Sequence, residues 1–139
     1  MLQINPYLTF DNKCREAMTF YHQCLGGELT IQTVGESGAK DHMPPETHNS
    51  IMHAALRKDG AILLMASDMI QGNEVKQGNN NALALICTSK EEIESCFKNL
   101  SAGGKVTSEL KEEFWGATFG MLTDKYGFTW MLNFDKPKA

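Results

Sequence analysis

The chain has 139 residues, of which 42% are hydrophobic and 22% charged, a composition typical of one soluble globular domain. Its formal net charge of -4 comes without any long basic run, which argues against a nucleic-acid partner and against an anionic membrane surface. No charged and then apolar leader opens the sequence, and no apolar run approaches the ~20 residues of a membrane span, so we expect a soluble, cytoplasmic protein.

The first half of the chain, residues 1–78, predicts the order strand, helix, strand, strand, strand. The expected elements are a strand at 4–10, a helix between Asp11 and Gly26, and strands at 28–34, 50–58 and 61–68. Asp11 or Asn12 is the expected helix cap, because both side chains can accept a bond from an early helical N–H. Gly26-Gly27 ends the helix, and Gly60 marks a turn between the last two strands.

The second half, residues 79–139, repeats this order. The expected elements are a strand at 82–87, a helix that starts at a Ser89–Glu92 capping box, a strand at 105–113, and two strands joined at Asp124–Gly127. A shift of 77 (103 minus 26) places Gly26 on Gly103, and a shift of 67 (127 minus 60) places Gly60 on Gly127. The surplus of ten residues (77 minus 67) lies in the 35–50 loop, which is either a lid or binding segment or a disordered surface loop.

The repeat predicts an α+β fold in which residues 1–139 form one domain of two tandem βαβββ units. We expect a curved mixed sheet around a cup, with the helices on its outer face. The row of Trp130, Leu132 and Phe134 would face the helices. Cup-facing rows would then be Asn5, Tyr7 and Thr9, the row Ile62, Leu64 and Ala66, and the row Thr129, Met131 and Asn133. Such a lining suits a mostly apolar small molecule, unless a partner subunit covers it.

Three stretches carry a family resemblance: NPYLTF, FYHQCLGGEL and FWGATFGMLTDKYGFTWML. Together with the paired units they resemble the vicinal oxygen chelate superfamily, which includes glyoxalases, bleomycin and fosfomycin resistance proteins and extradiol dioxygenases. More narrowly, they look like its PhnB-like branch, and the resemblance covers essentially the whole chain. It implies a small-molecule ligand and a homodimer.

Metal-dependent members of that superfamily place His and Glu ligands on the first and last strands of each unit. The resemblance puts those positions at Asn5, Leu64, Ala82 and Met131, and an amide, two hydrocarbons and a thioether do not suit a hard or borderline divalent ion. The sequence also lacks a glycine-rich nucleotide loop. Its four cysteines form no CxxC pair; Cys24, Cys87 and Cys96 are expected to be small core residues, while Cys14 lies at a helix start, where a thiol pKa can fall, but has no base nearby. We therefore expect neither a metal nor a cofactor.

His53 is the only histidine on a predicted strand, where it is either a satisfied core residue or a general base. Asp68 either orients a polar ligand atom or closes a turn, and Trp115 and Phe119 either pack in a core or interface or stack on a flat ligand. The candidate ligand-binding residues are Asn5, Tyr7, Thr9, Asp68, Trp115, Phe119 and Met131, with His53 as the candidate catalytic residue. The sequence thus predicts a metal-independent small-molecule binding protein. The alternative is an enzyme that uses His53 as its general base.

Overall fold

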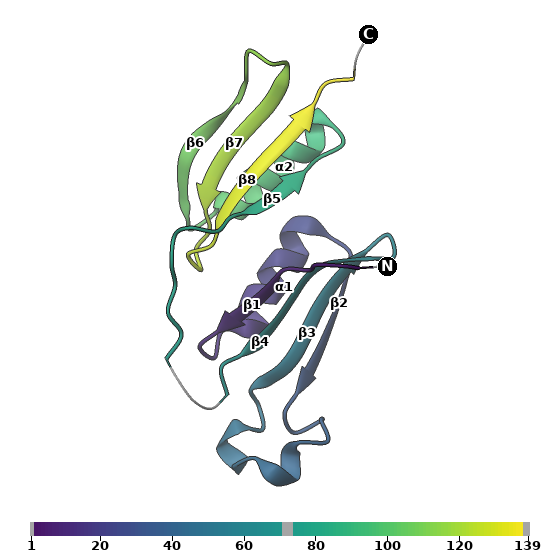
Figure 1. Ribbon diagram of the computed structural model, residues 1–139, viewed down its shortest axis with the longest axis vertical. Coiled ribbons are helices and arrows are strands. Elements are labelled where there is room, and N and C mark those ends of the chain that lie inside the picture. Colours follow the sequence, from purple (N-terminus) through teal and green to yellow (C-terminus); the bar gives the residue numbers. More distant parts are fainter. Residues whose placement is uncertain (1, 71–73, 138–139) are drawn as a thin grey trace. The chain divides into compact units, whose positions relative to one another are not determined.

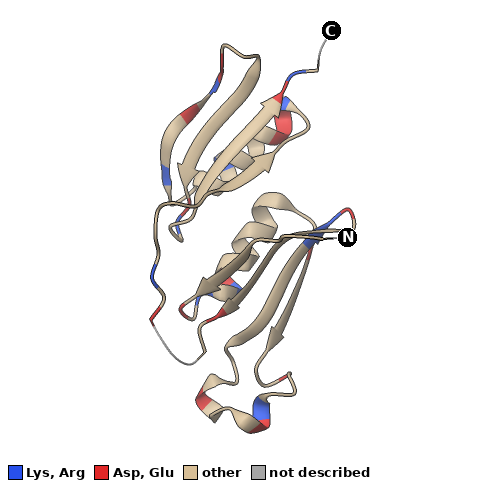
Figure 2. Cartoon of the chain, in the orientation of Figure 1, with Lys and Arg blue, Asp and Glu red and all other residues tan. Residues whose placement is uncertain are grey.

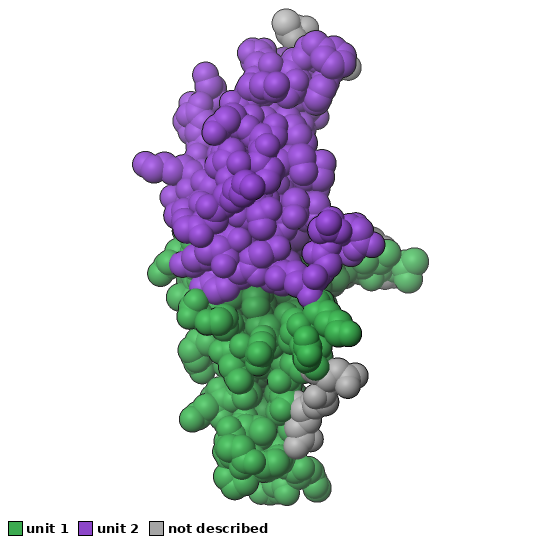
Figure 3. Space-filling view, turned by 90° about the vertical axis from the view of Figure 1, so that its left-hand side faces the viewer, with its two compact units in different colours: residues 1–76 green, residues 77–139 purple. Residues whose placement is uncertain are grey.

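The computed structural model describes residues 2–70 and 74–137. The chain divides into two compact units, unit 1 with residues 1–76 and unit 2 with residues 77–139, which Figure 3 colours separately. Each unit runs in the order strand, helix and three strands, so the predicted α+β fold of two βαβββ units is confirmed. The cup enclosed by both units stays a prediction.

Unit 1 builds a four-stranded mixed sheet with a helix on one face (Figure 1). Its elements are β1 (Tyr7–Phe10), α1 (Cys14–Leu25), β2 (Glu28–Thr33), η1 (Lys40–His42), η2 (Pro45–Thr47), β3 (Ile51–Lys58) and β4 (Ala61–Asp68). The strand order is β1-β4-β3-β2, with β1 and β4 parallel and the other neighbours antiparallel. The charged residues of these strands lie at the strand ends (Figure 2), so the middle of the sheet is uncharged.

Unit 2 repeats this architecture with strand order β5-β8-β7-β6. Its elements are β5 (Leu83–Ile86), α2 (Lys90–Ser101), β6 (Lys105–Glu112), β7 (Ala117–Thr123) and β8 (Thr129–Asp135). As predicted, Trp130 and Leu132 are buried in the row that faces α2. Within residues 2–70 and 74–137 no helix is both long and apolar enough to cross a membrane.

Helix α1 forms because apolar residues recur along one side of it at helical spacing. Its buried residues are Cys14, Ala17, Met18, Tyr21, Cys24 and Leu25. The predicted cap at Asp11 or Asn12 is wrong, because the residue at the cap position is Lys13, whose side chain makes no capping bond. Instead, the backbone N–H of Cys14 donates to Asp68 Oδ1 at 3.0 Å. A residue from the end of β4 therefore takes over the role of the local cap.

Helix α2 begins with the predicted local cap. The backbone N–H of Glu92 donates to Ser89 Oγ at 3.1 Å, and Glu92 Oε1 accepts from the backbone N–H of Thr88 at 2.8 Å. The carboxylate thus reaches back one residue further than in the usual capping box, where it would meet the N–H of the cap residue itself. The two helices of the repeat therefore start by different means, one local and one tertiary.

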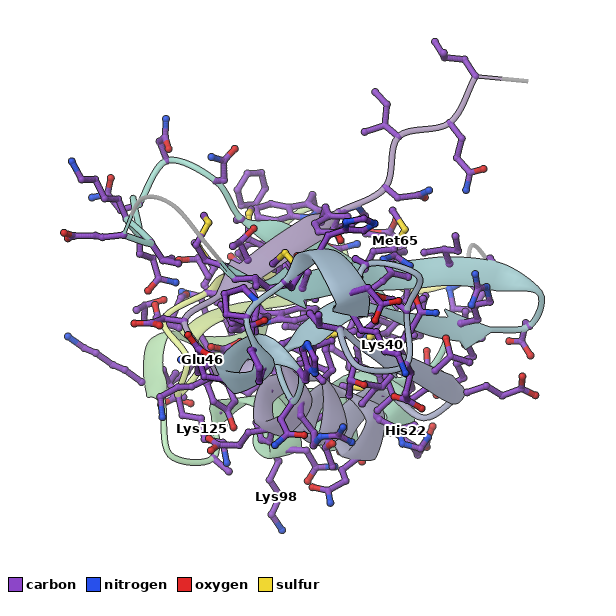
Figure 4. The ribbon with its side chains drawn as sticks, turned by 90° about the horizontal axis from the view of Figure 1, so that it is seen from below. His22, Lys40, Glu46, Met65, Lys98 and Lys125 are labelled. Carbon is purple, nitrogen blue, oxygen red and sulfur yellow. The ribbon has the colours of Figure 1, made fainter. Side chains whose placement is uncertain are left out.

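The strand register divides the unit 1 sheet into two faces. Leu8 and its β4 partner Ala66 are buried on the side that α1 covers. Two further pairs point to the opposite side: Tyr7 with Met65, and Thr9 with Ser67. We call this opposite side the helix-free face of unit 1. Figure 4 shows Met65 on it, across the sheet from α1 with its labelled His22.

The cup-facing row predicted for β4, which was Ile62, Leu64 and Ala66, is wrong. Leu64 and Ala66 are buried on the helix side, in register with buried residues of β3. The pairing of β3 with β4 passes from Leu64 to Ile62 and skips Leu63, a bulge that no local pattern announces. A slip of one residue exchanges the two faces of a strand, so the rest of the row changes sides.

The pairing identifies Met65, and not Leu64, as the counterpart of Met131. Tyr7 pairs with Met65, and Ala84, which the shift of 77 places on Tyr7 (84 minus 7), pairs with Met131. The true shift on this strand is therefore 66 (131 minus 65). A constant shift of 67 also fails because the hairpin loops differ: residues 59–60 connect β3 to β4, whereas residues 124–128 connect β7 to β8.

The 35–50 segment is an ordered loop between β2 and β3. The backbone N–H of Val34 donates to Ser50 O and that of Gly35 to His48 O, both at 2.9 Å, which ties the two ends together. Inside the loop, His48 Nε2 lies 3.0 Å from Lys40 O and 3.1 Å from Met43 O. The structure thus shows a folded loop rather than the disordered alternative, and its role as a lid stays a prediction.

Candidate functional site

Two aromatic side chains meet on the helix-free face of unit 1. Tyr7 OH lies 3.4 Å from His53 Nδ1, and the two ring centroids are 5.9 Å apart. The residues belong to β1 and β3, with β4 between these strands, so the contact depends on the sheet order and not on sequence proximity. Tyr7 remains 49% exposed, which leaves its ring accessible to a ligand. The contact places a flat apolar ring beside two polar atoms, the Tyr7 hydroxyl oxygen and His53 Nδ1.

Uncharged polar groups surround this contact. The strand positions that share the helix-free face of unit 1 with it are Thr9, Thr30, Gln32, Ala55, Met65 and Ser67. They supply hydroxyl and amide groups that donate or accept hydrogen bonds, and a polarizable thioether. The paired charged residues Glu28 and Arg57 share this face as well, at its end, two same-face pairs away from Gln32 and His53. The part of the face around Tyr7 and His53 is therefore suited to an uncharged ligand with a flat apolar part.

Two of the predicted binding residues lie elsewhere. Asp68 is 6% exposed and sits on the helix side of β4, where its oxygens accept from the backbone N–H groups of Cys14 at 3.0 Å and Ile51 at 2.9 Å. Its assignment as a ligand-orienting residue is therefore wrong, for the same reason that the β4 row was wrong. Asn5 precedes β1, and its Oδ1 accepts a hydrogen bond from Gln3 Nε2 at 3.0 Å.

Met131 and Phe119 lie on the helix-free face of unit 2, the side of that sheet away from α2. Met131 pairs with Met121 of β7 and Ala84 of β5, and Phe119 pairs with Asn133 of β8. This face is more apolar than its counterpart in unit 1 at two equivalent positions, since Ala84 stands where Tyr7 stands and Phe119 stands where His53 stands in the first copy. The two copies thus share a backbone and differ in the chemistry of this face.

Trp115 lies at the tip of the β6–β7 hairpin and not on a strand. It is 56% exposed and packs edge-on against Phe114, with 5.0 Å between the ring centroids. The turn is closed by the backbone N–H of Gly116, which donates to Glu113 O at 3.0 Å. The structure therefore rules out a core role for Trp115 within unit 2.

The residues of this chain do not fit the metal centre that the fold family implies. With the register of β4 corrected, Met65 replaces Leu64 among the four candidate positions, which then offer an amide, a methyl group and two thioethers. Those groups still do not suit a hard or borderline divalent ion. Over residues 2–70 and 74–137, no three His, Cys, Asp or Glu side chains gather closely enough to hold a metal ion.

Cys14, the one cysteine at a helix start, is chemically inert in this fold. Its side chain is fully buried, and burial together with the nearby Asp68 carboxylate raises the pKa of the thiol from 9.0 to about 12. Because the thiolate is the nucleophilic form, almost none of the reactive species exists at neutral pH. Cys14 therefore contributes to packing and not to the chemistry of the site.

The sequence matches the profile of the Glyoxalase/Bleomycin resistance protein/Dioxygenase superfamily over residues 3–132. The chain belongs to this superfamily. Protein YjdN of Escherichia coli is 32% identical over 143 residues, which cover 95% of each chain. In structure, protein PA1353 of Pseudomonas aeruginosa is similar with a TM-score of 0.86 and 39% identity, over 99% of this chain and 100% of that one.

A second solved structure identifies the branch of the superfamily. It is the putative 3-demethylubiquinone-9 3-methyltransferase, PhnB protein, of Bacillus cereus, with a TM-score of 0.75 and 27% identity over 96% of this chain and 99% of that one. The predicted PhnB-like branch is thereby confirmed. Membership of the superfamily accounts for the βαβββ scaffold and does not by itself assign a function to the two helix-free faces.

Met65 and Ser67 are site residues that the sequence analysis missed. Both lie on β4, on the same face as Tyr7 and Thr9. The signal that would have found them is the parallel pairing of the first and last strands of each unit, which aligns Met65 with Met131 regardless of hairpin length. A constant shift between the two halves concealed this signal.

Proposed function

We propose that this superfamily member binds an uncharged, partly flat small molecule on the helix-free face of unit 1, without a metal ion. The observation that carries the proposal is the contact between Tyr7 and His53, because it places a half-exposed ring beside a polar imidazole. Membership of a superfamily that includes bleomycin resistance proteins supports a binding role. The proposal takes the protein to be a cytoplasmic homodimer with no nucleic-acid or membrane partner.

The chemistry of the face sets the class of ligand. A ring system would pack against the half-exposed ring of Tyr7, since aromatic pairs favour offset-stacked or edge-on contacts. A carbonyl or hydroxyl group on that ring system would bond to His53, Thr9 or Ser67, whose polar atoms share the face. The charged pair of this face, Glu28 and Arg57, lies four residues along β2 and β3 from Gln32 and His53. A carboxylate or an amine beside Tyr7 would therefore lose hydration without gaining an ion pair.

We expect a library of uncharged aromatic amide and ketone fragments to give hits on this face. Amide chemical shifts in ¹H–¹⁵N NMR spectra should change for Thr9, His53 and Ser67 when a hit binds. Replacing His53 by alanine or Tyr7 by phenylalanine removes one hydrogen-bonding group and should weaken a hit by about 3- to 10-fold, since one such bond contributes about 1 kcal/mol.

The matched control is His42→Ala, which removes an exposed histidine of the same unit from the loop helix η1 and should leave affinity unchanged. Adding a chelator should also leave binding unchanged. Hits whose shift changes avoid β1, β3 and β4, or whose binding disappears with the chelator, would overturn the proposal.

A second candidate function is an enzyme in which His53 is the general base, and the same contact favours it. If the Nδ1–H of His53 donates to Tyr7 O, then Nε2 has a lone pair available to take a proton from a substrate. If instead Tyr7 OH donates to Nδ1, then Nε2 carries the hydrogen and can only donate to a ligand. The tautomer of His53 thus separates the two functions.

The binding function predicts that neutral His53 carries its hydrogen on Nε2. Measuring the ¹⁵N shifts of the imidazole and their change in Tyr7→Phe would test this, because losing the donor at Nδ1 should move the population toward the other tautomer. A hydrogen on Nδ1 in the unmodified protein would favour the enzyme, and turnover lost in His53→Ala would then be the measurement to seek.

A further inference from the structure

Gln32 is the residue of β2 that lies directly beside His53 on the helix-free face of unit 1. The two residues are partners in the β2–β3 register, so their Cβ atoms are about 4.5–5.5 Å apart. The Gln32 side chain is exposed and therefore accessible to a ligand. Its carboxamide holds an oxygen that accepts hydrogen bonds and an NH2 group that donates them, side by side in one plane. The site thus includes a group that can form two parallel hydrogen bonds.

The backbone next to Gln32 is held in place. The β2–β3 register shifts by one residue just after the pair, where Met52 has no partner on β2. Bulges of this kind often occur beside binding and active sites, where they re-aim a side chain. The following residue, Thr33, donates its backbone N–H and its hydroxyl to Glu36 Oε1, at 3.0 and 2.9 Å. A fixed backbone lowers the entropic cost of ordering the Gln32 side chain in a complex.

One bicyclic ring system can reach both Tyr7 and Gln32. The Tyr7 hydroxyl oxygen lies 3.4 Å from His53 Nδ1, and Gln32 neighbours His53 on its other side, because β3 lies between β4 and β2. A ring that packs against Tyr7 therefore extends across His53 toward the carboxamide. A ketone or an alcohol at that end would engage only one of the two carboxamide groups and leave the other without a partner, which costs free energy.

We propose that Gln32 determines the specificity of this face by pairing with a lactam edge of the ligand. In a lactam a ring N–H adjoins a ring carbonyl, so the N–H donates to Gln32 Oε1 while the carbonyl accepts from Gln32 Nε2. Glutamine pairs in the same two-bond manner with the donor and acceptor edge of adenine. This pairing rests on the proposed function, because it requires the ligand ring to pack against Tyr7. It narrows the ligand class to planar heterocycles with adjacent N–H and C=O groups.

The test compares the affinity of carbostyril, a bicyclic aromatic lactam, with that of coumarin, in which a ring oxygen replaces the N–H. Both compounds are neutral, planar and nearly identical in shape, so they differ mainly in the donor. We expect carbostyril to bind about 5- to 10-fold more tightly, because coumarin loses one hydrogen bond and sets a ring oxygen against Gln32 Oε1. In a ¹H–¹⁵N NMR titration, carbostyril should also shift the side-chain NH2 signal of Gln32.

Gln32→Met keeps the length of the side chain and removes both amide groups. In this variant carbostyril and coumarin should bind with affinities within about 2-fold of each other, because the preference depends on the carboxamide. Binding of coumarin to the variant shows at the same time that the face is intact. The matched control is Gln23→Met, which replaces an exposed glutamine of α1 and should keep the preference of the unmodified protein.

Three outcomes would count against this role of Gln32. Equal affinities of the unmodified protein for carbostyril and coumarin, with shift changes on β1, β3 and β4, would overturn it and leave the proposed binding function standing. A preference for carbostyril that survives in Gln32→Met would do the same. If neither compound shifts the signals of these strands, the role of Gln32 and the proposed function both fail.

Discussion

Replacing Gly27 by alanine should destabilise the protein by about 3–5 kcal/mol, the largest loss we expect from a single methyl group. Gly27 adopts φ +88°, a conformation that costs a residue with a Cβ about 1–2 kcal/mol. A Cβ at this position would also overlap the carbonyl oxygen of Arg57 on β3, which is backbone and has no rotamer to adopt. Chemical denaturation followed by circular dichroism would measure the change in the free energy of unfolding.

Two other glycines of unit 1 separate the cost of the positive φ from the cost of the overlap with the β3 backbone. Gly60 has φ +80° with nothing within 4 Å of an added Cβ, so Gly60→Ala should cost only about 1 kcal/mol from backbone strain. Gly38 has neither a positive φ nor a contact within 4 Å, so Gly38→Ala should be neutral or stabilise by about 0.5 kcal/mol. Equal losses for the Gly27 and Gly60 variants would show that the approach of the β3 backbone is unimportant.

Replacing Asp124 by alanine should destabilise the protein by about 3–5 kcal/mol, because three donors lose their acceptor. Asp124 is 3% exposed; its Oδ1 accepts from the backbone N–H groups of Tyr126 at 2.8 Å and Phe128 at 3.1 Å. Its Oδ2 accepts from the indole N–H of Trp130 at 2.8 Å. The carboxylate therefore joins the β7–β8 turn to the core of unit 2, and thermal and denaturant unfolding would measure its loss.

A double-mutant cycle with Trp130→Phe separates the stability that Asp124 gives to the turn from the stability that it gives through the indole bond to the core. The phenylalanine variant removes the indole donor and keeps an aromatic ring in the buried row that faces α2. Asp124→Ala should then cost about 1–2 kcal/mol less in that background than alone, because one of the three bonds is already gone. Additive losses would mean that the indole bond contributes nothing, and that Asp124 acts only on its own turn.

Asp68 and Asp124 show how differently two buried carboxylates of a repeat can be predicted. Asp124 bonds to backbone groups two and four residues later, so its turn role follows from local sequence and was predicted. Asp68 bonds to Cys14, 54 residues earlier, and to Ile51, 17 residues earlier. No local pattern around Asp68 indicates either partner, and its assignment to the ligand site failed because the register of β4 places it on the helix side.

Short-range patterns were enough to determine the fold. Alternating apolar residues, the Ser89 cap and the paired glycines after each helix depend on contacts within a few residues, so each can be recognised in a single stretch of sequence. The repetition of the same order of elements in both halves then predicted two βαβββ units, and the family resemblance agreed with it. The sequence by itself therefore determined the scaffold and the superfamily.

Only the tertiary structure decided which side chains lie on the helix-free face of the scaffold. The bulge at Leu63 selects Met65 and Ser67 for the helix-free face, and the order β1-β4-β3 brings Tyr7 to His53 across 46 residues of chain. The face a strand presents depends on its register with a partner strand, and a shift of one residue reverses that face while barely changing the local pattern. Site chemistry in this protein is a property of strand pairing, which a linear sequence does not display.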